Sequence, residues 1–184
     1  MEASASPQPT QDEREVAAAI KRIDTSHPIT TVYGELPSVD TINSMPNIDI
    51  WGINSYRGIT FGDLFSQWSN RSQKPMFIAE YGADSFNANI NREDQQAQAD
   101  ATHALTLEIL NNASNGNTLG GTIFEWSDEW WKAGNPNSHD TGGIAPGGGP
   151  YPDMTFNEEW WGLVTVDRQP KQAYYTLQNL YLNH

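Results

Sequence analysis

The sequence predicts an α/β fold in which four strands form a parallel sheet. Strand-like and helical segments alternate along the chain, and this order favours parallel strands joined by right-handed crossovers. Three of the four strand-like segments are nearly continuous apolar runs, as in parallel strands that are buried on both faces. All four end in polar or aromatic residues, at the edge of the sheet where α/β folds carry their chemistry.

The N-terminal residues are small, polar and proline-containing, and we expect residues 1–12 to form a disordered leader. Residues 13–184 are long enough for one domain with its own core. This domain is predicted to begin with a helix over residues 13–24, whose apolar side chains share one face: Val16, Ala17, Ile20 and Ile23.

The first two strand–helix units follow this helix. Residues 27–36 are β-branched and aromatic and predict a strand, and residues 38–45 predict a short helix capped by Ser38. A second strand is expected over residues 48–56. The next helix, over residues 61–71, has apolar residues spaced for a single face: Phe61, Leu64, Phe65 and Trp68.

The second half of the chain continues the alternation around a long loop. The Gly-, Pro- and Asn-rich composition of residues 132–157 predicts this loop. Before the loop we expect a strand over residues 75–82, the longest helix over residues 91–113 and a strand over residues 119–127. After the loop we expect an extended segment over residues 161–169 and a closing helix over residues 170–182. Pro170 near the first turn favours the start of the closing helix.

The charge balance excludes some classes of partner. The chain has 10 Lys and Arg against 23 Asp and Glu, a net charge of −13. It therefore has no basic surface to replace the counterions of nucleic acid or to bind anionic membranes, and it suits a neutral or cationic substrate. Seven Trp and seven Tyr make it rich in aromatic residues, a composition common in proteins that handle sugars.

The absence of cysteine excludes disulfides and cysteine-based zinc sites, and no residue spacing indicates a metal ion or another cofactor. No apolar run approaches the ~20 residues of a membrane span. The N-terminus has neither a basic n-region nor an apolar h-region, so we expect no signal peptide in this chain. Localisation stays open, and a secreted or periplasmic protein is compatible with this composition.

The stretch KPMFIAEYGAD, residues 74–84, carries the strongest candidate site residue. An apolar strand runs directly into Glu80, and a carboxylate at the rim of a core is costly unless it is solvated, paired or used. The alternative is that Glu80 is simply the first solvated residue after a strand. Because the other strands also end in polar or aromatic residues on the same edge, a functional role is favoured.

Three segments together resemble the last three strands of a known class of enzyme. IDIWGINSYRG, KPMFIAEYGAD and GGTIFEWSDEWWK resemble, in order, the sixth, seventh and eighth strands of retaining (β/α)8-barrel glycoside hydrolases. They look most like the catalytic domain of family 2, the β-galactosidase and β-glucuronidase type. The resemblance implies that residues 13–184 are the C-terminal half of such a domain, a partial TIM barrel whose four βα units correspond to strands 5–8.

The resemblance also implies a retaining double displacement. One carboxylate attacks the anomeric carbon, and a second carboxylic acid protonates the leaving oxygen. By position Glu80 matches the nucleophile, and Tyr56 would hydrogen-bond it. Asn54 would position the sugar or the carboxylate, and Trp126 would lie under the sugar ring. For Tyr56 and Trp126 the alternative is a structural role in the core or the barrel.

The sequence departs from the family at the acid/base residue. In the family this glutamate follows an asparagine at the end of the fourth strand, whereas the Asn-Glu pair of this chain, Asn157-Glu158, lies in the late loop. Glu35, at the end of the first strand here, is a candidate substitute. We therefore expect the nucleophile-bearing half of a domain without its acid/base. The leader would be the loop after a missing fourth strand, or unrelated sequence.

Acidic and aromatic residues gather after the last strand. We expect Glu125, Asp128 and Trp130 to bind substrate, in a wall that also contains Glu129, Trp131, His139, Asp140, Glu158, Glu159, Trp160 and Trp161. The alternative is a satellite core, and at least half of the paired tryptophans should be structural. Lys132 is expected to pair with an acidic neighbour rather than to contact substrate.

Three functions stay open. They are hydrolysis of O-glycosidic bonds in β-linked carbohydrates, transglycosylation by the same chemistry, and carbohydrate binding by a non-catalytic or remnant half-barrel. Transfer or hydrolysis depends on whether a sugar or water enters the acceptor site. Four parallel strands also have two open edges and an uncovered apolar face, so we expect the isolated chain to be unstable, to aggregate or to self-associate.

Overall fold

The computed structural model describes residues 11–114, 116–132 and 149–183. Its centre is one parallel sheet in which the strand order follows the chain order, β1-β2-β4-β7. The strands span Thr30–Tyr33, Ile50–Asn54, Met76–Tyr81 and Thr118–Ile123. The predicted α/β fold with four parallel strands is therefore confirmed.

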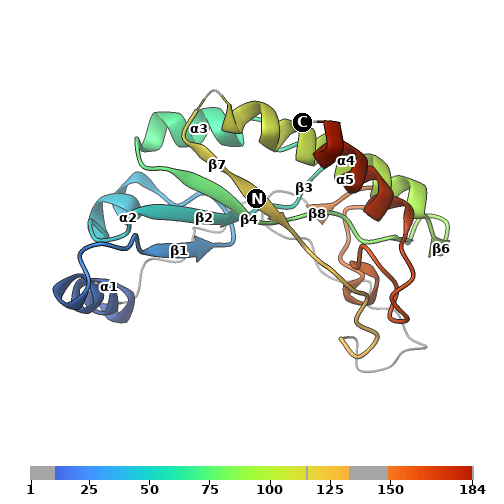
Figure 1. Cartoon of the computed structure of the whole chain (residues 1–184), viewed down its shortest axis with the longest axis horizontal. Helices are drawn as coiled ribbons and strands as arrows, with labels where there is room; N and C mark the ends of the chain where they lie inside the picture. Colours follow the sequence, from blue (N-terminus) through green and yellow to red (C-terminus); the bar gives the residue numbers. More distant parts are fainter. Residues whose placement is uncertain (1–10, 115, 133–148, 184) are drawn as a thin grey trace.

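Three helices lie along one side of this sheet, as Figure 1 shows for α3, α4 and α5. The α-helices of the described residues are, in chain order, α1 (Gln11–Ile23), α2 (Val39–Ser44), α3 (Leu64–Arg71), α4 (Gln95–Ala113) and α5 (Gln172–Asn183). The connections contain two short strand pairs and a 3-10 helix: β3 (Arg57–Gly58) with β8 (Gly149–Pro150), β5 (Phe86–Asn87) with β6 (Arg92–Glu93), and η1 (Glu158–Trp160).

Side-chain caps fix where α2 and α4 begin, because they bind backbone N–H groups that have no partner within a helix. Ser38 accepts a hydrogen bond from the Thr41 backbone N–H at 3.0 Å, as the sequence predicted. Asp94 accepts one from the Ala97 N–H at 3.1 Å, so α4 begins four residues after the start of the expected helix.

The two ends of the chain differ from expectation in detail. The helix α1 begins at Gln11 and so includes two residues of the expected leader; residues 1–10 lie outside the described residues. The segment over residues 161–169 is irregular, because its pairing is limited to isolated bridges of Val164 with Ser127 and with Pro170.

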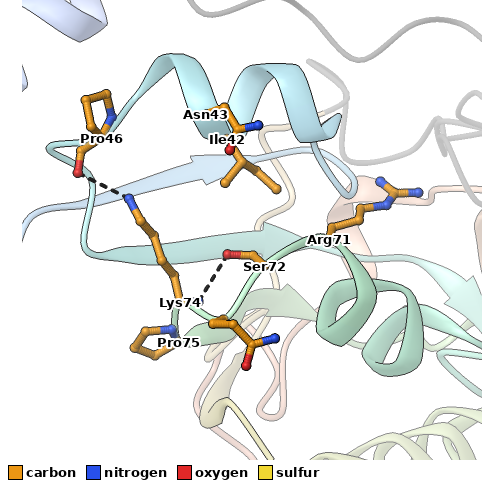
Figure 2. A pocket seen from close by; sticks show the side chains of 8 residues that line it. Ile42, Asn43, Pro46, Arg71, Ser72, Lys74 and Pro75 are labelled. Atoms are coloured by element: carbon orange, nitrogen blue, oxygen red, sulfur yellow. Dashed lines mark hydrogen bonds between the residues drawn. The ribbon is translucent and has the colours of Figure 1, made fainter.

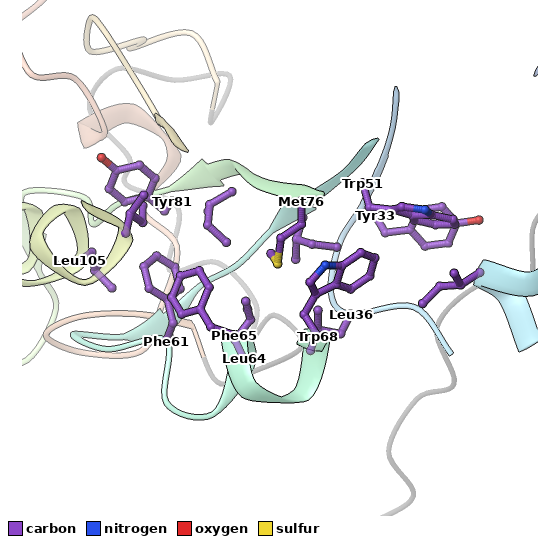
Figure 3. Packing of buried hydrophobic residues seen from close by; sticks show 14 of the residues in the cluster. Tyr33, Leu36, Trp51, Phe61, Leu64, Phe65, Trp68, Met76, Tyr81 and Leu105 are labelled. Carbon is purple, nitrogen blue, oxygen red and sulfur yellow. The ribbon is translucent and has the colours of Figure 1, made fainter. Parts of the chain in front are cut away.

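The main core lies between the sheet and helices α3 and α4 (Figure 3). Successive strand residues point to opposite faces, so Trp51 and Ile53 of β2 share one face, and Met76 and Ile78 of β4 lie beside them. These side chains pack against buried residues of the helices and their connections: Phe61, Leu64, Phe65, Trp68, Ala101, Leu105 and Ile109.

The opposite face of the sheet is open over the described residues. An added Cβ at Gly52 would lie 2.9 Å from Val32 Cγ2 and 3.0 Å from the Phe77 ring, so all three residues share this face. Val32 is 48% exposed and Phe77 is partly exposed. Within the described chain, β1 and β7 also have no strand on their outer edges. The sheet is therefore covered on one face, and only its opposite face and outer edges are available to a partner.

Candidate functional site

The carboxyl ends of β2 and β4 bring three of the predicted residues together. Asn54, the last residue of β2, is the Cα partner of Glu80 in β4. The Ser55 backbone N–H donates to the Glu80 carbonyl at 2.9 Å, which holds the turn after β2 against β4. Tyr56 then donates a hydrogen bond from Oη to Glu80 Oε2 at 2.9 Å. The contact between Tyr56 and Glu80 that the sequence predicted is present.

Tyr56 is held in place by aromatic neighbours. Its ring packs edge-on against Phe156 and Trp161, with centroids 5.2 and 5.1 Å away. Burial raises the pKa of the Tyr56 phenol above its ordinary value, and the charge of Glu80 raises it further. The phenol therefore keeps its proton and donates a hydrogen bond to Glu80, which orients the carboxylate.

Lys132 gathers three carboxylates near this pair. Its Nζ lies 3.5 Å from Glu125 Oε1 and 2.9 Å from Glu129 Oε2. The same Nζ lies 3.6 Å from Glu158 Oε2 and 4.4 Å from the centre of the Phe124 ring. Burial raises the pKa of Glu125 to about 7, although the positive charge of Lys132 opposes this rise. The sequence predicted one acidic partner for Lys132, and the structure has three: Glu125, Glu129 and Glu158.

Glu35 is fully engaged by Arg57. The guanidinium donates from Nε to Glu35 Oε2 at 2.8 Å and from Nη2 to Oε1 at 2.6 Å, a bidentate pair of the strong kind. The Leu36 backbone N–H also donates to Oε1 at 2.8 Å. Both oxygens of Glu35 are therefore occupied by donors, so Glu35 is a poor substitute for the family's acid.

Asp128 is enclosed in the fold, which corrects the expectation that it binds substrate. Its side chain is 1% exposed, and Lys171 Nζ lies 2.6 Å from Oδ1. The Gly162 backbone N–H donates to the same oxygen at 2.9 Å. Burial raises the pKa of Asp128 and lowers that of Lys171, while each charge favours the ionised form of the other. The ion pair of Asp128 and Lys171 therefore connects the segment after β7 to the start of α5.

The predicted platform residue Trp126 is exposed beside α5. It is 58% exposed, and its ring packs edge-on against Tyr174 of α5 with centroids 6.1 Å apart. With that helix it lines an apolar pocket of about 330 Å³. No described ring contact or hydrogen bond joins it to Glu80 or Tyr56, so its placement under the sugar stays a prediction.

The other late tryptophans divide between core and surface. Trp130 is partly buried and packs edge-on against Trp160 at 4.5 Å, which favours the satellite-core alternative over substrate binding. Trp161 is buried under Tyr56, and Trp131 is 64% exposed. His139 and Asp140, also predicted for this wall, lie outside the described residues.

Sequence reasoning missed several residues that build the site. Phe156 supports Tyr56, Arg57 fixes Glu35, and Phe124 lies under Lys132. Only Arg57 had a local signal, because it directly follows Tyr56 at the same strand end. Asn54 Oδ1, next to Glu80 in the sheet, is buried and has no hydrogen-bond partner among the described residues.

A larger pocket, of about 650 Å³, lies at the opposite edge of the sheet (Figure 2). Its walls come from the end of α2 and from the segment between α3 and β4, and they contain Arg71 and Lys74. Arg71 donates to the carbonyls of Leu36 and Pro37, and Lys74 donates to the carbonyl of Ile48 at 2.5 Å. Both cations are therefore bound to backbone carbonyls of the surrounding segments.

Two further properties of the described residues concern membranes and metal ions. No helix among them combines the length and the apolar character that crossing a membrane requires. Within the same part of the chain, His, Cys, Asp and Glu side chains do not gather in groups of three or more that could hold a metal ion.

Known proteins were compared with the chain. No family model matches it, and no curated protein matches it in sequence. Solved structures do match: a GH2 β-galacturonidase from Eisenbergiella tayi is 18% identical with a TM-score of 0.61, over 95% of this chain and 31% of that chain. A β-D-glucuronidase of Dictyoglomus thermophilum is 16% identical with a TM-score of 0.62, over 94% and 28%. A Ruminococcus gnavus β-glucuronidase is 17% identical with a TM-score of 0.63, over 94% and 29%.

These likenesses establish the fold. The chain folds like part of glycoside hydrolases of family 2, which confirms the predicted resemblance and the partial TIM barrel at the level of fold. It spans about 30% of the length of the structures that it matches.

Proposed function

We propose that this chain carries the nucleophile of a retaining β-glycoside hydrolase, with Glu80 attacking the anomeric carbon. The observation that carries the proposal is the hydrogen bond of 2.9 Å from Tyr56 Oη to Glu80 Oε2 at the carboxyl end of β4. A nucleophilic carboxylate must be oriented toward the reacting carbon, and a half-buried phenol that keeps its proton orients it through this hydrogen bond.

Supporting observations concern the position of this pair. Glu80 lies at the carboxyl edge of a parallel sheet, where the active sites of (β/α)8 enzymes lie. The similar structures are named β-glucuronidase and β-galacturonidase. In this chain, however, three carboxylates share Lys132, so we expect a neutral β-glycoside to be preferred over an anionic uronide.

Covalent trapping tests the proposal. The protein is incubated with a panel of 2,4-dinitrophenyl 2-deoxy-2-fluoro-β-glycosides that includes glucoside, galactoside and glucuronide, and the labelled peptide is mapped by mass spectrometry. We expect one sugar on the peptide that contains Glu80, because the activated leaving group departs without a proton donor. Sugar binding without label on any carboxylate would favour the non-catalytic alternative instead. Product analysis with added sugar acceptors would separate transglycosylation from hydrolysis.

Exposed apolar residues of α1 and β1 give a prediction on assembly. Val16, Ile20 and Ile23 of α1 are exposed, as is Val32 of the edge strand β1, and unpaired parallel edges are templates for pairing. We expect the isolated chain to elute in light-scattering chromatography as a dimer or larger species rather than as a monomer. Ile20→Glu should shift this distribution toward monomer, whereas Ile90→Glu, at an exposed position outside these elements, should not. A monodisperse wild-type monomer with a sharp thermal transition would contradict the prediction.

A further inference from the structure

Asp84 is a buried carboxylate that follows Glu80 by four residues and has no part in the chemistry proposed above. It is 1% exposed. The Phe86 backbone N–H donates to its Oδ1 at 3.0 Å. Asn157 donates from Nδ2 to the same oxygen at 3.3 Å and from its backbone N–H to Oδ2 at 3.4 Å. One enclosed carboxylate therefore binds both its own turn and a residue 73 positions further along the chain.

Asn157 extends this contact to residues 149–157, which we call the anchored segment. Asn157 is 0% exposed, and its Nδ2 also donates to Thr155 Oγ1 at 3.2 Å. The hydroxyl and the backbone N–H of Thr155 both donate to Asp153 Oδ1 at 3.0 Å. Asp153 Oδ2 in turn accepts from the Ala88 backbone N–H at 2.6 Å. The anchored segment is thus bound at two points to the connection that follows β4.

The anchored segment places Phe156 against Tyr56. The Phe156 ring packs edge-on against the Tyr56 ring with centroids 5.2 Å apart, and it stacks on Trp161 at 5.6 Å and an interplanar angle of 24°. At the start of the segment, the Gly149 N–H donates to the Tyr56 carbonyl at 2.7 Å. The segment therefore holds Tyr56 by its backbone and by its ring, while the Tyr56 hydroxyl donates to Glu80 Oε2.

We propose that Asp84 is a positioning residue for Glu80, an inference that rests on the proposed function. Asp84 fixes Asn157 and with it the anchored segment. Phe156 of this segment holds the Tyr56 ring, and the Tyr56 hydroxyl orients Glu80. A displacement of about 1 Å at a reacting group costs up to about 10²-fold in rate. Loss of the anchor should therefore slow bond formation at Glu80 and leave sugar binding largely intact.

Inactivation kinetics with the fluorosugar that labels the wild-type chain test this role, because they separate bond formation at Glu80 (kinact) from sugar binding (Ki). For Asp84→Ala we expect kinact to fall about 10- to 100-fold with little change in Ki. Asn157→Ala cuts the same contact from the other side and should act alike. Asp84→Asn keeps the Oδ1 acceptor and should recover most of the loss. Ser38→Ala, which removes the cap of α2, is the control and should change neither constant.

A double-mutant cycle separates positioning through Tyr56 from a general loss of structure. Tyr56→Phe removes the hydroxyl that binds Glu80 and should itself lower kinact. In the Tyr56→Phe background, Asp84→Ala should lower kinact only slightly further, because residues that act through one contact are not additive. Losses that multiply in the double variant would overturn the inference, since Asp84 would then act on the site by another route.

NMR of the chain with ¹³C-labelled tyrosine reads the anchor without any turnover. The Tyr56 ring signals, identified by their loss in Tyr56→Phe, are shifted by the neighbouring rings of Phe156 and Trp161. Asp84→Ala should move them toward the values of an exposed tyrosine. If Glu80 is labelled in the wild-type chain but these signals do not move, the nucleophile stands and Asp84 has no positioning role. If Glu80 is never labelled, the proposed function falls and the positioning role falls with it, even where the signals move.

Discussion

If Glu80 is the nucleophile, replacing it by alanine is expected to lower the turnover of aryl β-glycosides by about 10⁴-fold or more. The reason is that no other carboxylate accepts the hydrogen bond of Tyr56 Oη in the described site. Added azide should restore turnover and should form the α-glycosyl azide, because azide attacks the substrate directly in the cavity left by the carboxylate. The product anomer is measured by NMR.

The stereochemistry of the product identifies the role of Glu80. Rescue at position 80 should give the α-azide if Glu80 is the nucleophile, whereas a β-azide would contradict this role. Asp100→Ala, which removes an exposed carboxylate on α4, serves as the control and should keep wild-type turnover. Residual hydrolysis of Glu80→Ala at the wild-type rate would show that Glu80 is only a solvated strand end.

Replacing Lys171 by methionine is expected to cost about 3–5 kcal/mol of the free energy of unfolding, because it leaves Asp128 buried without its cation. The Lys171 side chain is 0% exposed and Asp128 1%. Lys171 also donates to Ser85 Oγ at 3.0 Å and to the Trp160 carbonyl at 3.1 Å. Urea unfolding followed by tryptophan fluorescence measures the loss.

Two variants make this prediction specific. Lys21→Met breaks the more exposed pair with Asp49 and should cost only about 0–1 kcal/mol. The double variant Lys171→Met with Asp128→Leu should recover part of the loss, because no buried charge is left unpaired. A double variant as unstable as Lys171→Met alone would show that the hydrogen bonds of Lys171, rather than the charge pair, stabilise this region.

The sequence predicted the sheet because its strands depend on local patterns. Apolar runs placed β2 and β4, and the residues that end these strands must meet at one edge of a parallel sheet. Glu80 was found for this reason, whereas its contact with Tyr56 was implied by the resemblance to glycoside hydrolases. Ser38 was found as a cap because capping depends on a few consecutive residues.

Predictions failed where the outcome depends on distant segments. Asp128 looked like a loop carboxylate, yet Lys171, 43 residues further along the chain, covers it. The contact of Trp126 with Tyr174 of α5 was likewise not foreseen. In both cases the partner comes from the C-terminal helix region, and no local pattern shows which side chain it will reach.

By itself the sequence determined the alternation of parallel strands and helices, the edge on which polar residues gather, and Glu80 as the carboxylate at that edge. These follow from periodicity and chain direction, which act over a few residues. Only the tertiary structure decided which acidic residues are enclosed, which are bound to cations, and which have a pKa raised by burial. The physical reason is that desolvation and ion pairing of Glu35, Asp128 and Glu125 are set by groups brought close in space by folding.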